Sequence, residues 1–199
     1  QMARRIATCG YWGMLPNLYY RRVKEFVMDW TEECRTVMFE HMNSLSNSMM
    51  VDDCRSLLKA ASEYESASTG VAGCVGYCMS GPFAFTAAAE INDRIRAAAS
   101  IHGVRLFTDS ELSPHLRAHE VKGELYFGCA ETDEWAPREM IDNLENHLSQ
   151  TDVRYRIEWY PNTEHGFVFP DRGAKYHQNA SERHWHRILS LFERNLKFS

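Results

Sequence analysis

The sequence has no excess of basic residues and no long apolar run, and each absence excludes a class of protein. Its 22 Lys and Arg residues are outnumbered by 27 Asp and Glu residues, so the formal net charge is -5. A chain with this charge lacks the basic surface that neutralises a phosphate backbone, so we expect no nucleic-acid partner. The longest strongly apolar run, around residues 84–89, is far shorter than the roughly 18 residues that cross a bilayer. We therefore expect no membrane partner and no export signal.

Cysteine is also scarce, with six in 199 residues. Six cysteines are too few for a disulfide scaffold in a chain of this length. Most of them lie in apolar stretches, where a free thiol packs as a small hydrophobic side chain. These features predict a cytoplasmic protein with reduced thiols.

Strands and helices alternate through the last two thirds of the chain. Buried strands are predicted over residues 71–77, 96–101, 124–129 and 153–159, and helices over residues 81–90, 139–149 and 175–195. Such alternation requires parallel crossovers, so we expect a three-layer α/β fold with a mostly parallel sheet. No repeat or linker divides the sequence, which predicts one domain over residues 1–199.

The N-terminal third has a weaker pattern. Residues 1–7 read as a helix that stops at Gly10, and residues 11–15 read as a short strand. A helix that begins at the first residue suggests that further chain precedes it. Residues 31–50 show no clear pattern, and Asp52 or Asp53 is the predicted N-cap of a helix that follows.

A cysteine stands where a buried strand meets a helix, in the run GYCMSG at residues 76–81. Small residues around Cys78 are typical of a nucleophile elbow, in which a sharp turn lifts the nucleophile above the sheet. A helix N-terminus would favour the Cys78 thiolate, and the Met79 N–H would face a developing oxyanion. The alternative is a structural cysteine in a tight turn.

An acid and a histidine follow the last two predicted strands. Asp133 comes after the strand that ends at Cys129, and His165 comes after the strand over residues 153–159. The carboxyl ends of parallel strands meet at one edge of a sheet. Each residue alone has an ordinary explanation, a solvated acid or a turn histidine. Together with Cys78 they follow the order of an α/β-hydrolase triad, so we predict a Cys-His-Asp site.

Two further side chains are candidates for the substrate pocket. His102 follows the strand over residues 96–101, and Trp135 lies two residues beyond Asp133. The alternative is that both fill space. His184 and His186 would point about 200° apart on a helix, unlike a metal-binding pair, and no glycine-rich phosphate loop is present. We therefore predict neither a metal nor a cofactor.

Four segments resemble the dienelactone hydrolase family of α/β-hydrolases, and the resemblance covers nearly all of the chain. They are GYCMSG, ELYFGCAETDEWAP, YPNTEHGF and GYWGMLPNLYYR. The resemblance implies an α/β-hydrolase fold and hydrolysis of a small, dienelactone-like ester or lactone through a thioester. It makes Cys78 the nucleophile, Asp133 the orienting acid and His165 the general base and acid. It also places Arg21 where the family has an arginine that meets the substrate carboxylate.

The chain departs from the family pattern at three places. Ser80 replaces a glycine of the elbow, and Phe169 stands where a second carboxylate-binding arginine is expected, which makes that pocket wall more apolar. The family's first strands, with the second oxyanion N–H, would lie upstream of Gln1. The second hypothesis is therefore a non-catalytic α/β-hydrolase-like domain that binds a ligand or partner.

Overall fold

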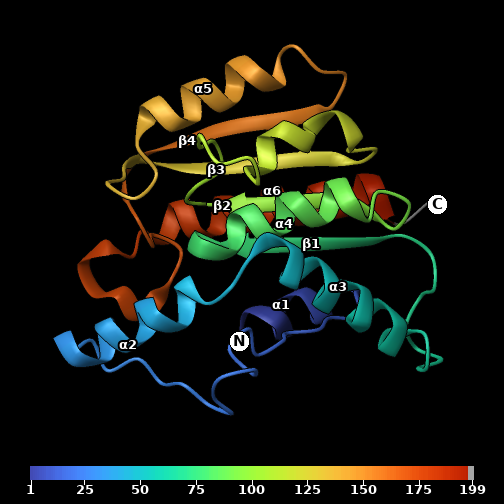
Figure 1. Ribbon diagram of the computed structural model, residues 1–199, viewed down its shortest axis with the longest axis horizontal. Coiled ribbons are helices and arrows are strands. Elements are labelled where there is room, and N and C mark those ends of the chain that lie inside the picture. The colour runs from blue at the N-terminus through green and yellow to red at the C-terminus, as the bar shows by residue number, and fades with distance from the viewer. Residues whose placement is uncertain (197–199) are drawn as a thin grey trace. The chain divides into compact units, whose positions relative to one another are not determined.

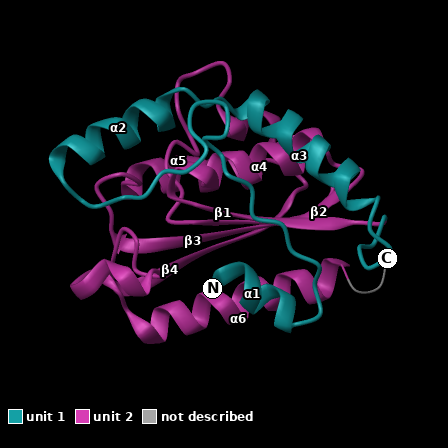
Figure 2. Cartoon of the chain, turned by 90° about the horizontal axis from the view of Figure 1, so that it is seen from below, with its two compact units in different colours: residues 1–69 teal, residues 70–199 magenta. Residues whose placement is uncertain are grey.

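The chain divides into two compact units in the computed structural model, which describes residues 1–196. The first unit comprises residues 1–69 and the second begins at Gly70. Figure 2 shows the two units in different colours. The prediction of a single domain over residues 1–199 stays a prediction.

The first unit is helical where it has regular structure. Its helices are α1 (Met2–Thr8), α2 (Glu32–Asn43) and α3 (Asn47–Ala61). Helix α2 begins because the Thr31 hydroxyl accepts a hydrogen bond from the Cys34 N–H at 3.2 Å. The Ser46 hydroxyl caps α3 in the same way, by accepting from the Met49 N–H at 3.2 Å. Both caps lie within residues 31–50, which show no clear pattern in the sequence.

Two predictions for this unit are wrong. Asp52 and Asp53 lie inside α3 and do not cap it, since the N-cap is Ser46, which precedes both of them in the chain. Residues 11–15 form no strand. A strand needs a hydrogen-bonded neighbour, and every strand in the described part of the chain belongs to the second unit.

The second unit is a parallel sheet between two helical layers. Its strands are β1 (Ala72–Tyr77), β2 (Ile95–Ile101), β3 (Glu124–Thr132) and β4 (Arg154–Glu164), and each pairs in parallel with the next along the chain. Helices α4 (Gly81–Glu90) and α5 (Arg138–Leu148) cover one face, and α6 (Gln178–Leu196) covers the other (Figures 1 and 2). Consecutive right-handed crossovers in one direction place their helices on one face, as α4 and α5 are placed. The predicted three-layer α/β fold is confirmed.

Short 3₁₀ turns complete this unit: η1 (Cys78–Ser80), η2 (Pro114–Glu120) and η3 (Pro170–Lys175). The helix predicted from residue 175 begins only at Gln178, because η3 occupies the preceding residues and Gly173 adopts a positive φ of 57°. Strands β3 and β4 extend beyond their predicted ends, to Thr132 and Glu164. These extensions carry the chain directly to Asp133 and His165. Among residues 1–196, no helix is long and apolar enough to span a membrane.

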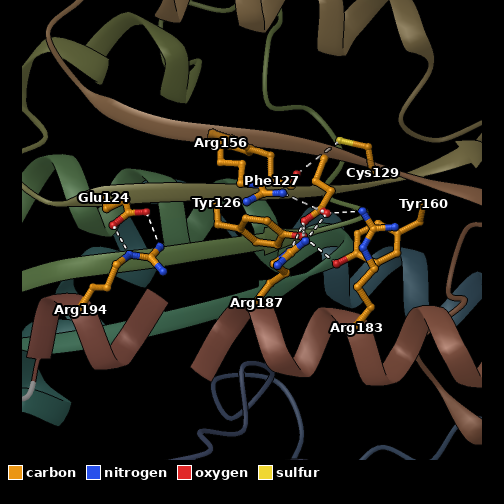
Figure 3. A network of polar contacts seen from close by, with 10 residues as sticks. Glu124, Tyr126, Phe127, Cys129, Arg156, Tyr160, Arg183, Arg187 and Arg194 are labelled. Atoms are coloured by element: carbon orange, nitrogen blue, oxygen red, sulfur yellow. Dashed lines mark hydrogen bonds and ion pairs between the residues drawn. The ribbon is translucent and has the colours of Figure 1, made fainter. Parts of the chain in front are cut away.

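A buried carboxylate links helix α6 to strands β3 and β4 through hydrogen bonds and ion pairs. Glu158 is 6% exposed. Arg187 donates to its two oxygens at 2.8 and 3.0 Å, and Tyr126 donates at 2.9 Å. Arg156 and Arg183 also donate to it, and Figure 3 shows these side chains converging. Burial raises the pKa of Glu158, but the hydrogen bonds of Arg187, Tyr126 and Arg183 outweigh burial and lower the pKa to about 2.

Candidate active site

The turn after β1 holds Cys78 in a strained backbone conformation. Cys78 has a φ of +53°, a left-handed value that is uncommon outside glycine. A Cβ at position 76 would collide with the carbonyl oxygen of Ser80, so Gly76 is required for the turn to close. Cys78 then begins η1, which leads directly into α4. The turn has the backbone geometry expected of a nucleophile elbow.

Ser80 closes this turn with its side chain. Its hydroxyl accepts a hydrogen bond from the Tyr77 N–H at 2.7 Å and donates to the Tyr77 carbonyl at 2.8 Å. The serine at a position where the family has glycine therefore ties the end of β1 to the start of η1. At this departure from the family pattern, the serine side chain stabilises the turn that holds Cys78.

Asp133 follows β3 and is held in place by backbone N–H groups. Its Oδ1 accepts hydrogen bonds from Trp135 at 2.9 Å and from Ala136 at 3.0 Å. The Asp133 side chain is only 1% exposed. An acid that is buried and bonded in this way has a fixed orientation.

His165 follows β4 and joins this acid to the cysteine. Its Nδ1 lies 2.9 and 2.8 Å from the two carboxylate oxygens of Asp133, and the Cys78 side chain is near enough to raise the pKa of the imidazole. Burial lowers the pKa of His165, but the hydrogen bonds to Asp133 and Cys78, together with their charges, raise it to about 9. The three predicted residues therefore meet, and the imidazolium is the favoured form of His165 at neutral pH.

His102 packs beneath the histidine of this site. Its ring centroid lies 4.6 Å from that of His165, and it also contacts the rings of Tyr77 and Phe169. The side chain is 1% exposed, and neither ring nitrogen has a hydrogen-bond partner among the described residues. Burial lowers the pKa of His102 well below its ordinary value, and the charges of His165, His184 and Arg172 lower it further. His102 is therefore a neutral ring at the site.

The other two candidates in this unit, Phe169 and Trp135, differ in their surroundings. Phe169 contacts the rings of Tyr77 and His102, each at 5.5 Å between centroids. Trp135 is 52% exposed, in the loop that holds Asp133. Phe169 thus belongs to an aromatic group next to His165, whereas the Trp135 side chain reaches the surface.

Arg21 lies in the first unit and is held by an acid. Its Nη1 and Nη2 donate to Asp53 at 2.7 and 2.6 Å, and the Tyr20 hydroxyl donates to the same carboxylate at 2.9 Å. This bidentate ion pair compensates the guanidinium charge. A carboxylate that binds Arg21 would have to share it with Asp53.

Sequence reasoning missed a second arginine, Arg172 in η3. The side chain is half-buried, and its Nε lies 3.6 Å from the position that a Cβ on Gly166 would occupy, next to His165. Burial lowers the pKa of Arg172, while the negative charges of Asp171 and Cys78 oppose this effect. The sequence around it, PDRG, is typical of an exposed turn and carries no signal of this position. In the described part of the chain, no three His, Cys, Asp or Glu side chains are grouped as metal ligands.

Comparisons with known proteins show which sequences and folds this chain is similar to. A protein of Synechocystis sp. named "Putative carboxymethylenebutenolidase" is 24% identical over 201 residues, which cover 98% of this chain and 80% of that protein. A crystal structure of a "Putative Dienelactone Hydrolase" from Klebsiella pneumoniae has a TM-score of 0.83 at 20% identity, over 97% of this chain and 79% of that one. A dienelactone hydrolase-like promiscuous phosphotriesterase from metagenomic libraries has a TM-score of 0.77 at 16% identity, over 98% and 79% of the two chains.

These structures confirm the predicted α/β-hydrolase fold. The model of the dienelactone hydrolase family matches residues 1–196. The match spans both compact units and includes every candidate residue described above. The prediction of a hydrolase of this kind, made from four short motifs, is confirmed, and the chain belongs to the dienelactone hydrolase family.

Proposed function

We propose that the protein hydrolyses a small ester or lactone through a Cys78–His165–Asp133 triad. The observation that carries this proposal is the chain of contacts from the Asp133 carboxylate through His165 to Cys78, which sits on a strained turn at the start of a helical segment. Asp133 fixes which imidazole nitrogen carries a proton, since its oxygens accept from Nδ1. The other nitrogen is then free to exchange a proton with the Sγ of Cys78.

The reaction follows from these roles. His165 holds the proton taken from the thiol as an imidazolium, and the Cys78 thiolate attacks the substrate carbonyl to form a tetrahedral oxyanion, to which the Met79 N–H donates. Collapse breaks the ester C–O bond, and His165 gives its proton to the leaving alkoxide. A water molecule deprotonated by His165 then attacks the thioester, and Cys78 leaves as the thiolate with release of the carboxylic acid. The reaction needs no redox partner.

Three side chains are proposed to shape the substrate pocket in the second unit. His102 and Phe169 supply an apolar, aromatic surface next to His165, and Trp135 lies at the exposed side of the acid loop. Arg21 is proposed to meet a substrate carboxylate, in competition with Asp53. We expect the protein to act in the cytoplasm on a small molecule.

The test is hydrolysis of p-nitrophenyl acetate together with alkylation by iodoacetamide at neutral pH. We expect Cys78 to be alkylated well ahead of Cys74 and Cys129, because burial raises the pKa of Cys129 and a thiol is the less reactive form. Alkylation of Cys78 should abolish ester hydrolysis. Equal alkylation of the three cysteines in the folded protein, or full activity of Cys78→Ala, would instead favour the non-catalytic binding domain.

A further inference from the structure

His102 reaches the site with a strained backbone. It directly follows β2, and its φ is +38°, a left-handed value that few residues other than glycine adopt. Its N–H donates to the carbonyl of Gly128 in β3 at 2.7 Å, which fixes this backbone at the edge of the sheet. Strain of this kind costs free energy and is concentrated at functional sites. The conformation of His102 therefore indicates a role at the site.

The ring of His102 lies against the ring of His165. The two ring centroids are 4.6 Å apart and the ring planes are tilted by 59°. Phe167 and Phe169 contact the same ring, at 5.9 and 5.5 Å between centroids. With 1% of its surface exposed, the His102 ring influences the substrate pocket only through the residues packed against it.

The nitrogen atoms of this ring take part in no hydrogen bond within residues 1–196. A neutral imidazole has one N–H donor and one acceptor nitrogen, and leaving both unbonded in the protein interior costs free energy. The ring is neutral, because burial and the charges of His165, His184 and Arg172 lower its pKa. It therefore acts on His165 as an aromatic surface and not through a hydrogen bond or a charge.

The bond between His165 and Asp133 fixes only part of the imidazole. Nδ1 lies 2.9 and 2.8 Å from the two carboxylate oxygens, which holds that nitrogen in place. The ring can still turn about the line from Nδ1 to the carboxylate, and such a turn would move the opposite nitrogen away from Cys78. A rigid ring packed at 4.6 Å blocks this movement on one side.

We propose that His102 is a positioning residue whose ring holds the imidazole plane of His165 in line with Cys78. This inference rests on the proposed triad. His102 takes up no proton in the reaction and acts by contact alone. A misplacement of about 1 Å can slow a reaction by about 100-fold. Because both the formation and the hydrolysis of the thioester use His165, loss of the ring should lower kcat and leave KM nearly unchanged.

The first measurement is the steady-state hydrolysis of p-nitrophenyl acetate. In His102→Ala we expect kcat to fall by about 10- to 100-fold, with KM within about three-fold of the wild type. His102→Phe should recover most of the lost kcat, because it restores a flat ring of similar size and needs no hydrogen-bond partner.

The second measurement reports the position of His165 without turnover. It is the exchange rate with water of the Nδ1 proton that His165 donates to Asp133, followed by NMR of protein with ¹⁵N-labelled histidine. The resonance is assigned by its absence from His165→Gln. We expect faster exchange in His102→Ala and an exchange rate close to that of the wild type in His102→Phe.

His115→Ala is the matched control. His115 is also a buried histidine of the second unit, and its ring stacks on Phe107 at 3.9 Å between centroids. Its removal should lower the melting temperature without changing kcat or the exchange rate of the His165 proton. If His102→Ala does not fold, His102→Leu provides the comparison with His102→Phe, since leucine fills much of the space without a flat ring.

Three results would overturn the proposal. One is a folded His102→Ala or His102→Leu variant with the kcat and proton exchange of the wild type. Another is a folded His102→Phe variant no more active than His102→Ala, which would show that a ring nitrogen takes part in the reaction. The third is an equal loss of kcat in His115→Ala. Failure of the proposed function is distinguishable, because ester hydrolysis would then be absent from the wild type or retained in Cys78→Ala, while proton exchange would still report on the contact between the two rings.

Discussion

Replacing Glu158 by glutamine should destabilise the protein while leaving the shape of its interior unchanged. Glu158 is buried between β4 and α6, and its carboxylate accepts hydrogen bonds from three arginines and a tyrosine. Its pKa of about 2, against an ordinary value of 4.5, corresponds to about 3 kcal/mol in favour of the ionised, folded state. For a chain of this size the melting temperature should fall by about 6–12 °C.

The pH dependence of this loss has a definite sign. Because the folded-state pKa is lowered, the contribution of Glu158 is complete above pH 4.5 and disappears as the pH falls toward 2. Urea unfolding followed by circular dichroism at pH 7 and pH 3.5 should therefore show a smaller difference between wild type and Glu158→Gln at the lower pH. If the difference in the free energy of unfolding between the two proteins is the same at pH 7 and pH 3.5, the charge of Glu158 is not the source of the stabilisation.

The matched control is Glu120→Gln. Glu120 also accepts two hydrogen bonds from one arginine, Arg117, at 2.9 and 2.7 Å, but both side chains are partly exposed. Ion pairs at the surface contribute at most about 1 kcal/mol. If Glu120→Gln and Glu158→Gln lower the free energy of unfolding equally, burial does not strengthen the ion pairs of Glu158.

Three other results are expected. Cys78→Ala and His165→Ala should each lower kcat for an activated ester by about 10³-fold or more. The double variant should be little worse than either single variant, because residues that act as one catalytic unit do not contribute independently. A double variant whose loss equals the product of the two single losses in steady-state assays would contradict this. The pKa of His165 is raised to about 9, so its contribution to stability is present below pH 6.5 and is lost as the pH rises through 9. The melting temperature of the wild type should therefore decline over that range more than that of His165→Ala. Parallel declines in the two proteins would show that His165 does not cause the loss of stability. Burial, with the charge of His147, lowers the pKa of His115, so stability should fall as the pH drops below 6.5, and His115→Phe, which keeps a ring against Phe107, should remove that part of the decline in a thermal scan.

The strands and the order along the chain of the three candidate site residues could be predicted because both depend on local patterns. Apolar runs alternating with helices specify a parallel sheet, and the ends of successive strands place Cys78, Asp133 and His165 at one edge. The sequence does not reveal α2 or the first turns of α3, because their apolar residues are interrupted by polar and charged ones, so that only the Thr31 and Ser46 caps mark where these helices begin.

Charged side chains far apart in the sequence could not be paired in advance. Glu158 lies two residues after Arg156 in β4, and nothing in the sequence indicates that its partners Arg183 and Arg187 come from α6. Asp53, a predicted helix cap, instead binds Arg21. Such pairs depend on the tertiary fold, since nothing in the spacing of two charges reveals that folding will bury one of them.

The positive φ of Cys78 has a consequence for how the sequence can change. A left-handed backbone at a residue with a Cβ costs on the order of 1 kcal/mol or more, and glycine would relieve that cost. Selection for stability alone would therefore disfavour the cysteine at this position, and only the proposed reaction would retain it. A descendant of this protein released from catalysis would gain stability by exchanging Cys78 for glycine, while Gly76 would persist because closure of the turn requires it. A glycine at position 78 beside an unchanged position 76 would thus mark a member of the family that has given up hydrolysis but kept the fold.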